Sequence, residues 1–111
     1  EQSEDCAAVS LGKIEIRTRS RMPEGKRVRV CIRPESIVIL SNPPDGYTSA
    51  RNVLKGKIEE ISLSSVGYRV VVCCNGIPFV VRVTGESAGS LKPDQQVYIM
   101  FKAAAVHLIE E

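Results

Sequence analysis

The chain has 111 residues, of which 43% are hydrophobic and 25% charged, as expected for one soluble globular domain. The 15 basic and 13 acidic residues leave a net charge of only +2, which argues against a dedicated nucleic-acid binder. There is no apolar run of about 18 residues that could span a membrane, and no signal-peptide pattern. The first residue is Glu and most enzymes are larger, so we expect a binding module cut from a longer chain.

The N-terminal part of the sequence predicts a tail followed by a few short strands. Residues 1–11 are polar and acidic and are expected to form a frayed tail. Within 12–46, apolar and charged residues alternate from Ile14 to Thr18 and from Val28 to Ile32, and a further apolar run covers Ile37–Leu40. We expect these N-terminal strands to pack on the domain that follows, beyond a loop rich in Pro, Asn and Gly.

Residues 47–111 predict the main domain, an all-β unit. Its expected strands are Asn52–Ile61, Tyr68–Cys74, Pro78–Val83, Gln96–Lys102 and Val106–Ile109. Asn75-Gly76 predicts a tight hairpin, because both central positions of such a turn need a positive φ. Residues 84–91 predict a single helical turn capped by Thr84. Five short strands with one helical turn indicate a small Greek-key barrel, of which the OB-fold is the commonest case, with an extra N-terminal strand pair.

The sequence lacks the residue patterns of a catalytic or metal centre. The only histidine is His107, on a predicted strand, and there is neither a nucleophile elbow nor a phosphate-binding loop. Glu59 and Glu60 are adjacent on a predicted strand and should face opposite sides. We therefore expect no catalytic residues and no metal site. The four cysteines, without a C-x-x-C pair, are expected to be free thiols of a cytosolic protein: Cys6, Cys31, Cys73 and Cys74.

Basic residues are concentrated in the N-terminal part. Residues 13–33 hold eight of the fifteen, namely Lys13, Arg17, Arg19, Arg21, Lys26, Arg27, Arg29 and Arg33. Such a strip is either the solvated outer face of a strand pair or a contact surface for nucleic acid or another acidic partner.

Three short segments place hydroxyl or cationic side chains where loops meet strands, and together they suggest an oxyanion site. They contain Ser49, Arg51 and Asn52, then Thr84 and Ser87, then Lys102 and Ala103. Arg51 and Lys102 could neutralise a dianion, while the hydroxyls would be neutral donors. Taken singly, each residue also has an ordinary role as a turn, cap or surface residue.

The same segments resemble the molybdate-binding Mop domain of the transport-associated (TOBE) group. The S-A-R-N opening stands at Ser49–Asn52, the T-x-x-S motif at Thr84 and Ser87, and the K-A ending at Lys102-Ala103. Upstream, Ile32-Arg-Pro-Glu35 resembles the segment before this domain in ATP-binding subunits of ABC importers. The resemblance implies an OB-type barrel that binds molybdate or tungstate through Ser49, Arg51, Thr84, Ser87, Lys102 and the backbone of Ala103, with no cofactor.

The resemblance also implies the partners, the location and the regulatory role of the domain. The anion would lie between two barrels, so a dimer would complete the site. The domain itself would be non-catalytic and cytoplasmic, joined to the nucleotide-binding domain of an ABC importer ATPase at the inner face of the membrane, and would meet the membrane only through the permease. Anion binding would then inhibit transport, a feedback called trans-inhibition. The alternatives are a ligand-free dimerisation module, an OB-type nucleic-acid binder, and a free-standing molybdate storage protein or the effector half of a regulator.

Overall fold

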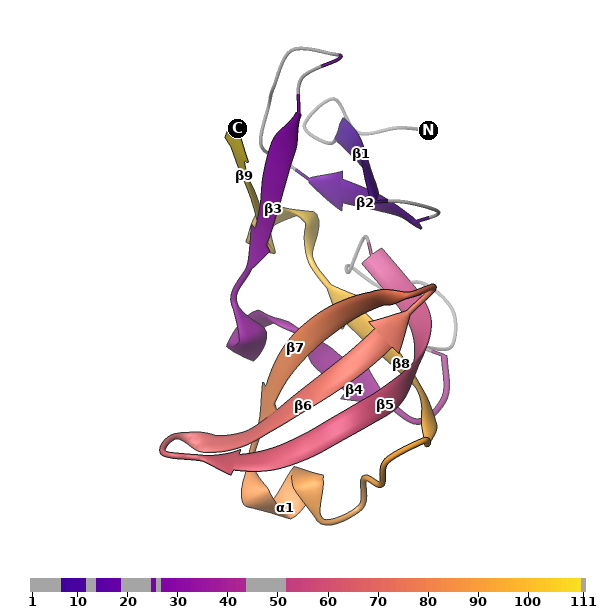
Figure 1. Ribbon diagram of the computed structural model, residues 1–111, viewed down its shortest axis with the longest axis vertical. Coiled ribbons are helices and arrows are strands. Elements are labelled where there is room, and N and C mark those ends of the chain that lie inside the picture. Colours follow the sequence, from indigo (N-terminus) through magenta and orange to yellow (C-terminus); the bar gives the residue numbers. More distant parts are fainter. Residues whose placement is uncertain (1–6, 12–13, 19–24, 26, 44–51, 111) are drawn as a thin grey trace.

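The computed structural model describes residues 7–11, 14–18, 25, 27–43 and 52–110. These residues are mostly in strands, with one short α-helix and two 3-10 turns (Figure 1). The strands are β1 (Ala7–Leu11), β2 (Ile14–Thr18), β3 (Val28–Ile32), β4 (Val38–Leu40), β5 (Asn52–Ser64), β6 (Gly67–Cys74), β7 (Ile77–Val83), β8 (Gln96–Phe101) and β9 (Val106–Glu110). The helix is α1 (Gly85–Ala88), and the 3-10 turns are η1 (Pro34–Ser36) and η2 (Ala103–Ala105).

A five-stranded antiparallel sheet forms the body of the domain, in the order β4-β8-β5-β6-β7. Strands β5, β6 and β7 follow one another as hairpins, and β8 returns by a longer connection to pair with β5. This is the Greek-key order, and the sheet curls into an open barrel (Figure 1). The expected all-β fold is therefore confirmed.

Local turn chemistry explains the hairpins on either side of β6. Between β6 and β7, Asn75 and Gly76 have φ values of 51° and 84°, so the expected tight turn is confirmed. Between β5 and β6, the Ser64 Oγ donates a hydrogen bond to the carbonyl of Gly67 at 2.8 Å. Gly67 itself has a φ of 123°, a conformation that side chains disfavour.

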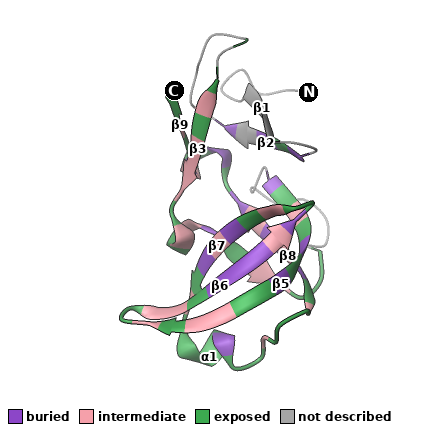
Figure 2. Ribbon diagram, in the orientation of Figure 1, coloured by how far each residue is buried: buried purple, intermediate pink, exposed green. Residues whose placement is uncertain are grey.

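The core lies inside the curl of the sheet. Buried aliphatic side chains from β5, β6, β7 and β8 pack there with Phe79 and Phe101, whose ring centroids lie 6.1 Å apart. Figure 2 shows buried residues along much of β6, the middle strand of the hairpins, whereas the sheet's ends and outer positions are exposed. The fully buried members include Ile58, Val70, Val72, Val81, Val97 and Ile99.

A β-bulge interrupts the pairing of β5 with β6. Ile58 is opposite Val72 and Glu60 is opposite Val71, so Glu59 is the extra residue. Both glutamates are exposed, and the strand at this point is not the regular one that the sequence predicted. The bulge coincides with a second contact of Ile58, whose backbone N–H donates to Gln95 at 2.9 Å and whose carbonyl accepts from Asp94 at 2.7 Å.

The N-terminal strands are more closely joined to the barrel than the sequence suggested. Residues 7–11, expected within a frayed tail, form β1 and pair with β2. Strand β4 is an edge of the main sheet, and β9 pairs with β3 instead of joining the barrel. Strand β8 has β5 on one side and β4 on the other, so it has no free edge for β9. The buried Thr18 hydroxyl then ties β2 to β9, donating to the carbonyl of Val106 at 3.0 Å.

Among the residues that the structure describes, no helix is both long and apolar enough to cross a membrane.

Candidate functional site

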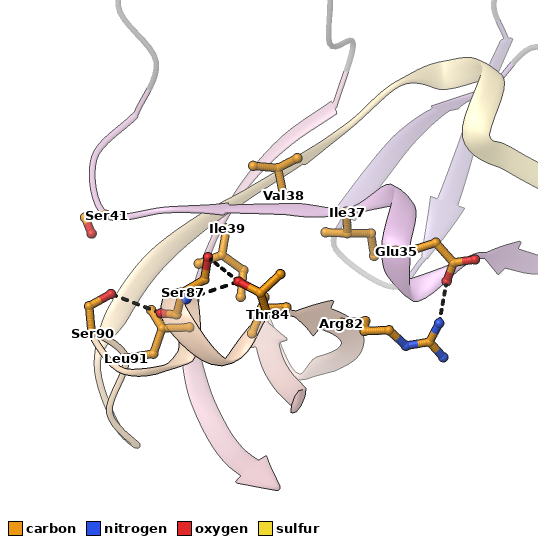
Figure 3. Close-up of a pocket in the computed structure, with 11 residues that line it drawn as sticks. Glu35, Ile37, Val38, Ile39, Ser41, Arg82, Thr84, Ser87, Ser90 and Leu91 are labelled. Atoms are coloured by element: carbon orange, nitrogen blue, oxygen red, sulfur yellow. Dashed lines mark hydrogen bonds and ion pairs between the residues drawn. The ribbon is translucent and has the colours of Figure 1, made fainter. Parts of the chain in front are cut away.

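An open pocket of about 400 Å³ lies where the curled sheet fails to close on itself. One wall is β4 with the residues beside it, and the other is the end of β7 with α1 and the turn that follows (Figure 3). The apolar side chains of Ile37, Ile39, Val83 and Leu91 form part of its lining. Hydroxyl groups come from Ser41, Thr84, Ser87 and Ser90.

Helix α1 brings Thr84 and Ser87 together in this pocket. Thr84 is extended at the helix N-cap, and its Oγ1 accepts a hydrogen bond from the Ser87 backbone N–H at 3.2 Å. The Thr84 hydroxyl also donates to the Ser87 Oγ at 3.2 Å (Figure 3). The expected capping role of Thr84 is therefore confirmed. Both side chains are exposed, so their hydroxyl groups can be reached by a ligand.

The pocket also contains an ion pair that the sequence did not reveal. Arg82, at the end of β7, donates from Nη1 to Oε1 of Glu35 on η1 at 3.3 Å (Figure 3). The two residues are distant in sequence and meet because η1 packs against β7. No local pattern would have indicated this pair. Glu86 is exposed and does not line the pocket, so its carboxylate is not part of this wall.

A second group of candidate residues lies where β5 begins and β8 ends. Asn52 is buried and pairs with Phe101 in the sheet. Lys102 follows directly as the exposed N-cap residue of η2, and Ala103 is buried within that turn. Ser49 and Arg51, predicted for the same group, lie outside the described residues.

The two groups lie at opposite ends of β5. Asn52 is the first residue of the strand, whereas Leu63 is opposite Tyr68, which in turn is opposite Val83, the residue before Thr84. Along β5 these ends are eleven residues apart, and a strand rises about 3.3 Å per residue. Figure 1 shows α1 at the far end of the sheet from the junction of β8 and β9. The described chain therefore does not bring all the candidate residues into one site.

These residues have the chemistry of anion recognition. Thr84 and Ser87 are neutral hydroxyl donors, and Lys102 carries an exposed cation. In the described ranges, no group of three or more His, Cys, Asp or Glu side chains is placed to hold a metal ion.

The comparisons with known proteins agree with this fold. The family model of the TOBE domain matches residues 48–108, so the chain belongs to the TOBE domain family. Among solved structures, the chain is similar to the cytoplasmic molybdate-binding protein ModG in a crystal form with molybdate bound. The TM-score is 0.75 at 22% identity, over 86% of this chain and 75% of that one, which supports the fold.

Two curated relatives belong to import systems. The chain is 36% identical over 84 residues to the molybdate/tungstate import ATP-binding protein WtpC of Pyrococcus horikoshii. It is 32% identical over 84 residues to the molybdenum import ATP-binding protein ModC of Haemophilus influenzae. Each alignment covers 74% of this chain but 24% of the relative, so the chain spans about a quarter of these proteins.

Proposed function

We propose that this TOBE domain binds molybdate or tungstate at a site shared between two copies of the chain. The carrying observation is the separation of the candidate residues: Thr84 and Ser87 lie at one end of β5, while Asn52, Lys102 and Ala103 lie at the other. When the Thr84 and Ser87 end of one copy lies against the Lys102 end of its partner, both groups of residues can contact the same anion. The similarity to importer proteins named for molybdate or tungstate supports this ligand class.

The residues suit a tetrahedral dianion. Lys102 supplies one positive charge, and Arg51, from the neighbouring segment of sequence, supplies the second. The hydroxyls of Thr84, Ser87 and Ser49 and the backbone of Ala103 complete the hydrogen bonds. A hydrogen bond to a charged group contributes about 1.5–3 kcal/mol, so four or five such bonds are sufficient for roughly micromolar affinity after desolvation.

We further propose that the domain is the non-catalytic regulatory part of an ABC importer ATP-binding protein. Its partners would be a second copy, the nucleotide-binding domain of the same chain, and the permease at the inner face of the membrane, with no nucleic acid. A ligand that binds one arrangement of the two domains favours that arrangement by its differential affinity. Cytoplasmic anion would thereby hold the importer in its inhibited state.

Calorimetric titration with molybdate, tungstate and sulfate tests the ligand class. We expect binding of the two larger dianions, close to one per chain, and loss of binding in Lys102→Ala and in the double variant Thr84→Val/Ser87→Ala. Lys57→Ala is the matched control, because Lys57 is an exposed cation next to the middle residue of β5 and outside the site. Unchanged binding by Lys102→Ala would reject the site.

Mixing the two variants tests whether the site is shared. In a mixed dimer of Lys102→Ala with Thr84→Val/Ser87→Ala, one site receives both intact groups and the other receives neither. Binding should therefore return in the mixture, to about half a site per chain in the mixed dimers. If the mixture stays inactive, the groups do not act across an interface.

The ligand-free dimerisation module remains the alternative, and the β5–β6 hairpin favours it. Leu63 and Val66 at its tip are 74% and 61% exposed, more than the other exposed large apolar side chains of the described residues, and are free to contact a partner. A stable dimer in sedimentation whose melting temperature does not respond to molybdate would support this alternative.

A further inference from the structure

The outer face of the β3–β9 pair places a cysteine opposite the chain's only histidine. Cys31 on β3 and His107 on β9 are directly paired in register. The alternate residues Val30, Ile32 and Leu108 pack against the core, so Cys31 and His107 occupy the outward positions. Cys31 is half-buried and His107 is exposed. Directly opposed residues have Cβ atoms about 4.5–5.5 Å apart, within reach of a contact between thiol and imidazole.

Two arginines flank this pair on the same side. Arg29 and Arg33 lie two residues before and after Cys31 in extended chain, and both are exposed. Within the described part of the chain, neither arginine forms an ion pair; the arginine ion pairs there are Arg69 with Glu60 and Arg82 with Glu35. The thiol therefore lies beside two cations that can attract a negatively charged reagent.

We propose that Cys31 is a site of reversible mixed-disulfide formation with a small, negatively charged disulfide such as glutathione disulfide. The arginines would attract the carboxylates of the reagent, and His107 would accept the thiol proton. None of these residues belongs to the proposed anion site, so the two proposals can fail independently.

The reaction is an exchange that needs no further oxidant. The Cys31 sulfur attacks one sulfur of the reagent, a new S–S bond forms to it, and the old S–S bond breaks. The second half of the reagent leaves as a thiolate and takes up the proton that Cys31 has lost. One disulfide and one thiol are consumed and one of each is formed.

The other described cysteines provide internal comparisons. Cys74 is 1% exposed, and burial raises its pKa to about 11, so it should not react in the folded protein. Cys73 is half-buried like Cys31, but it is opposite Lys57 on β5 and Pro78 on β7. It therefore has one cationic neighbour across the strands and no imidazole.

The experiment follows the modification of each cysteine by peptide mass spectrometry in the full chain carrying Cys6→Ser. The protein is incubated with glutathione disulfide, or with the neutral hydroxyethyl disulfide as a matched reagent. We expect Cys31 to be modified at least about tenfold faster than Cys73 by the charged reagent, because charge attraction commonly raises association rates by that factor or more. Arg29→Gln/Arg33→Gln should remove most of this advantage, and added salt should reduce it.

The neutral reagent separates a charged site from simple exposure. With hydroxyethyl disulfide, the advantage of Cys31 should be smaller and should not depend on the arginines, whereas His107→Gln should slow both reagents. If Cys31 reacts no faster than Cys73, or if charged and neutral reagents show the same preference in every variant, the proposal is wrong.

Discussion

Gly56 on β5 lies so close to Cys74 on β6 that no side chain fits between them. A Cβ atom built on Gly56 would lie 2.6 Å from the Cys74 Sγ and 2.8 Å from the carbonyl oxygen of Cys73. The absence of a side chain at Gly56 allows the two strands to approach as the sheet curls around its core.

Gly56→Ala should destabilise the domain, by about 1–3 kcal/mol, because the backbone of Cys73 cannot move away as a flexible side chain could. Urea unfolding followed by circular dichroism measures the change. Gly89→Ala is the control, since its added Cβ would meet nothing closer than 3.5 Å. Equal stability of both variants would show that β5 and β6 separate easily at this point.

Thr18→Val should loosen the attachment of β2 to β9. The substitution preserves the shape of a fully buried side chain but removes the hydroxyl that donates to the Val106 carbonyl. We expect a loss of about 1 kcal/mol in unfolding free energy, the usual contribution of one hydrogen bond. Thr18→Ser retains the donor but loses the methyl group, so it separates the hydrogen bond from packing. If Thr18→Ser lowers the unfolding free energy more than Thr18→Val does, packing is the larger contribution.

The Cys74 thiol predicts a loss of stability in alkali. Burial, and secondarily the neighbouring Cys73, raises its pKa from 9.0 to about 11. Between these values the folded chain keeps a proton that the unfolded chain releases, so stability is full below pH 9 and falls as the pH rises towards 11. The loss is up to about 2–3 kcal/mol at about 1.4 kcal/mol for each pKa unit. Cys74→Ala should flatten this part of the stability curve, and an unchanged slope would contradict the assignment.

Thr84 has a structural role that can be separated from the proposed ligand contact. Thr84→Val removes the oxygen that accepts from the Ser87 N–H and should cost about 1 kcal/mol, whereas Thr84→Ser should retain both the cap and anion binding. Thermal melting without anion measures the cap, and titration with tungstate measures the ligand contact. If the Thr84→Val variant has the same melting temperature as the wild type, the cap does not contribute to stability.

Features set by neighbouring residues were predictable from the sequence. The turn at Asn75-Gly76 depends on two residues that tolerate positive φ, and the cap of α1 depends on Thr84 and Ser87 being three apart. By contrast, the bulge at Glu59 coincides with the backbone contacts of Ile58 to Asp94 and Gln95, more than thirty residues away. The alternation of apolar and polar residues along a strand does not indicate such long-range contacts.

In the candidate site too, local features were predictable and long-range contacts were not. The helical turn predicted at residues 84–91 is present, and it brings the hydroxyls of Thr84 and Ser87 into contact. The Arg82–Glu35 pair was not predictable, because it depends on η1 packing against β7. Nor could sequence patterns show that Asn52 and Thr84 lie at opposite ends of β5, since that follows from the register of three strands. The binding role of these residues remains a prediction.

The pairing of β4 with β8 and of β3 with β9 also affects which fragment of the chain can fold by itself. The family match begins at residue 48, yet both partner strands come from earlier in the chain. A fragment starting at residue 48 would leave β8 and β9 with bare edges, an arrangement that promotes aggregation. We therefore expect a fragment that folds by itself to begin no later than Val28, upstream of the residues that match the family.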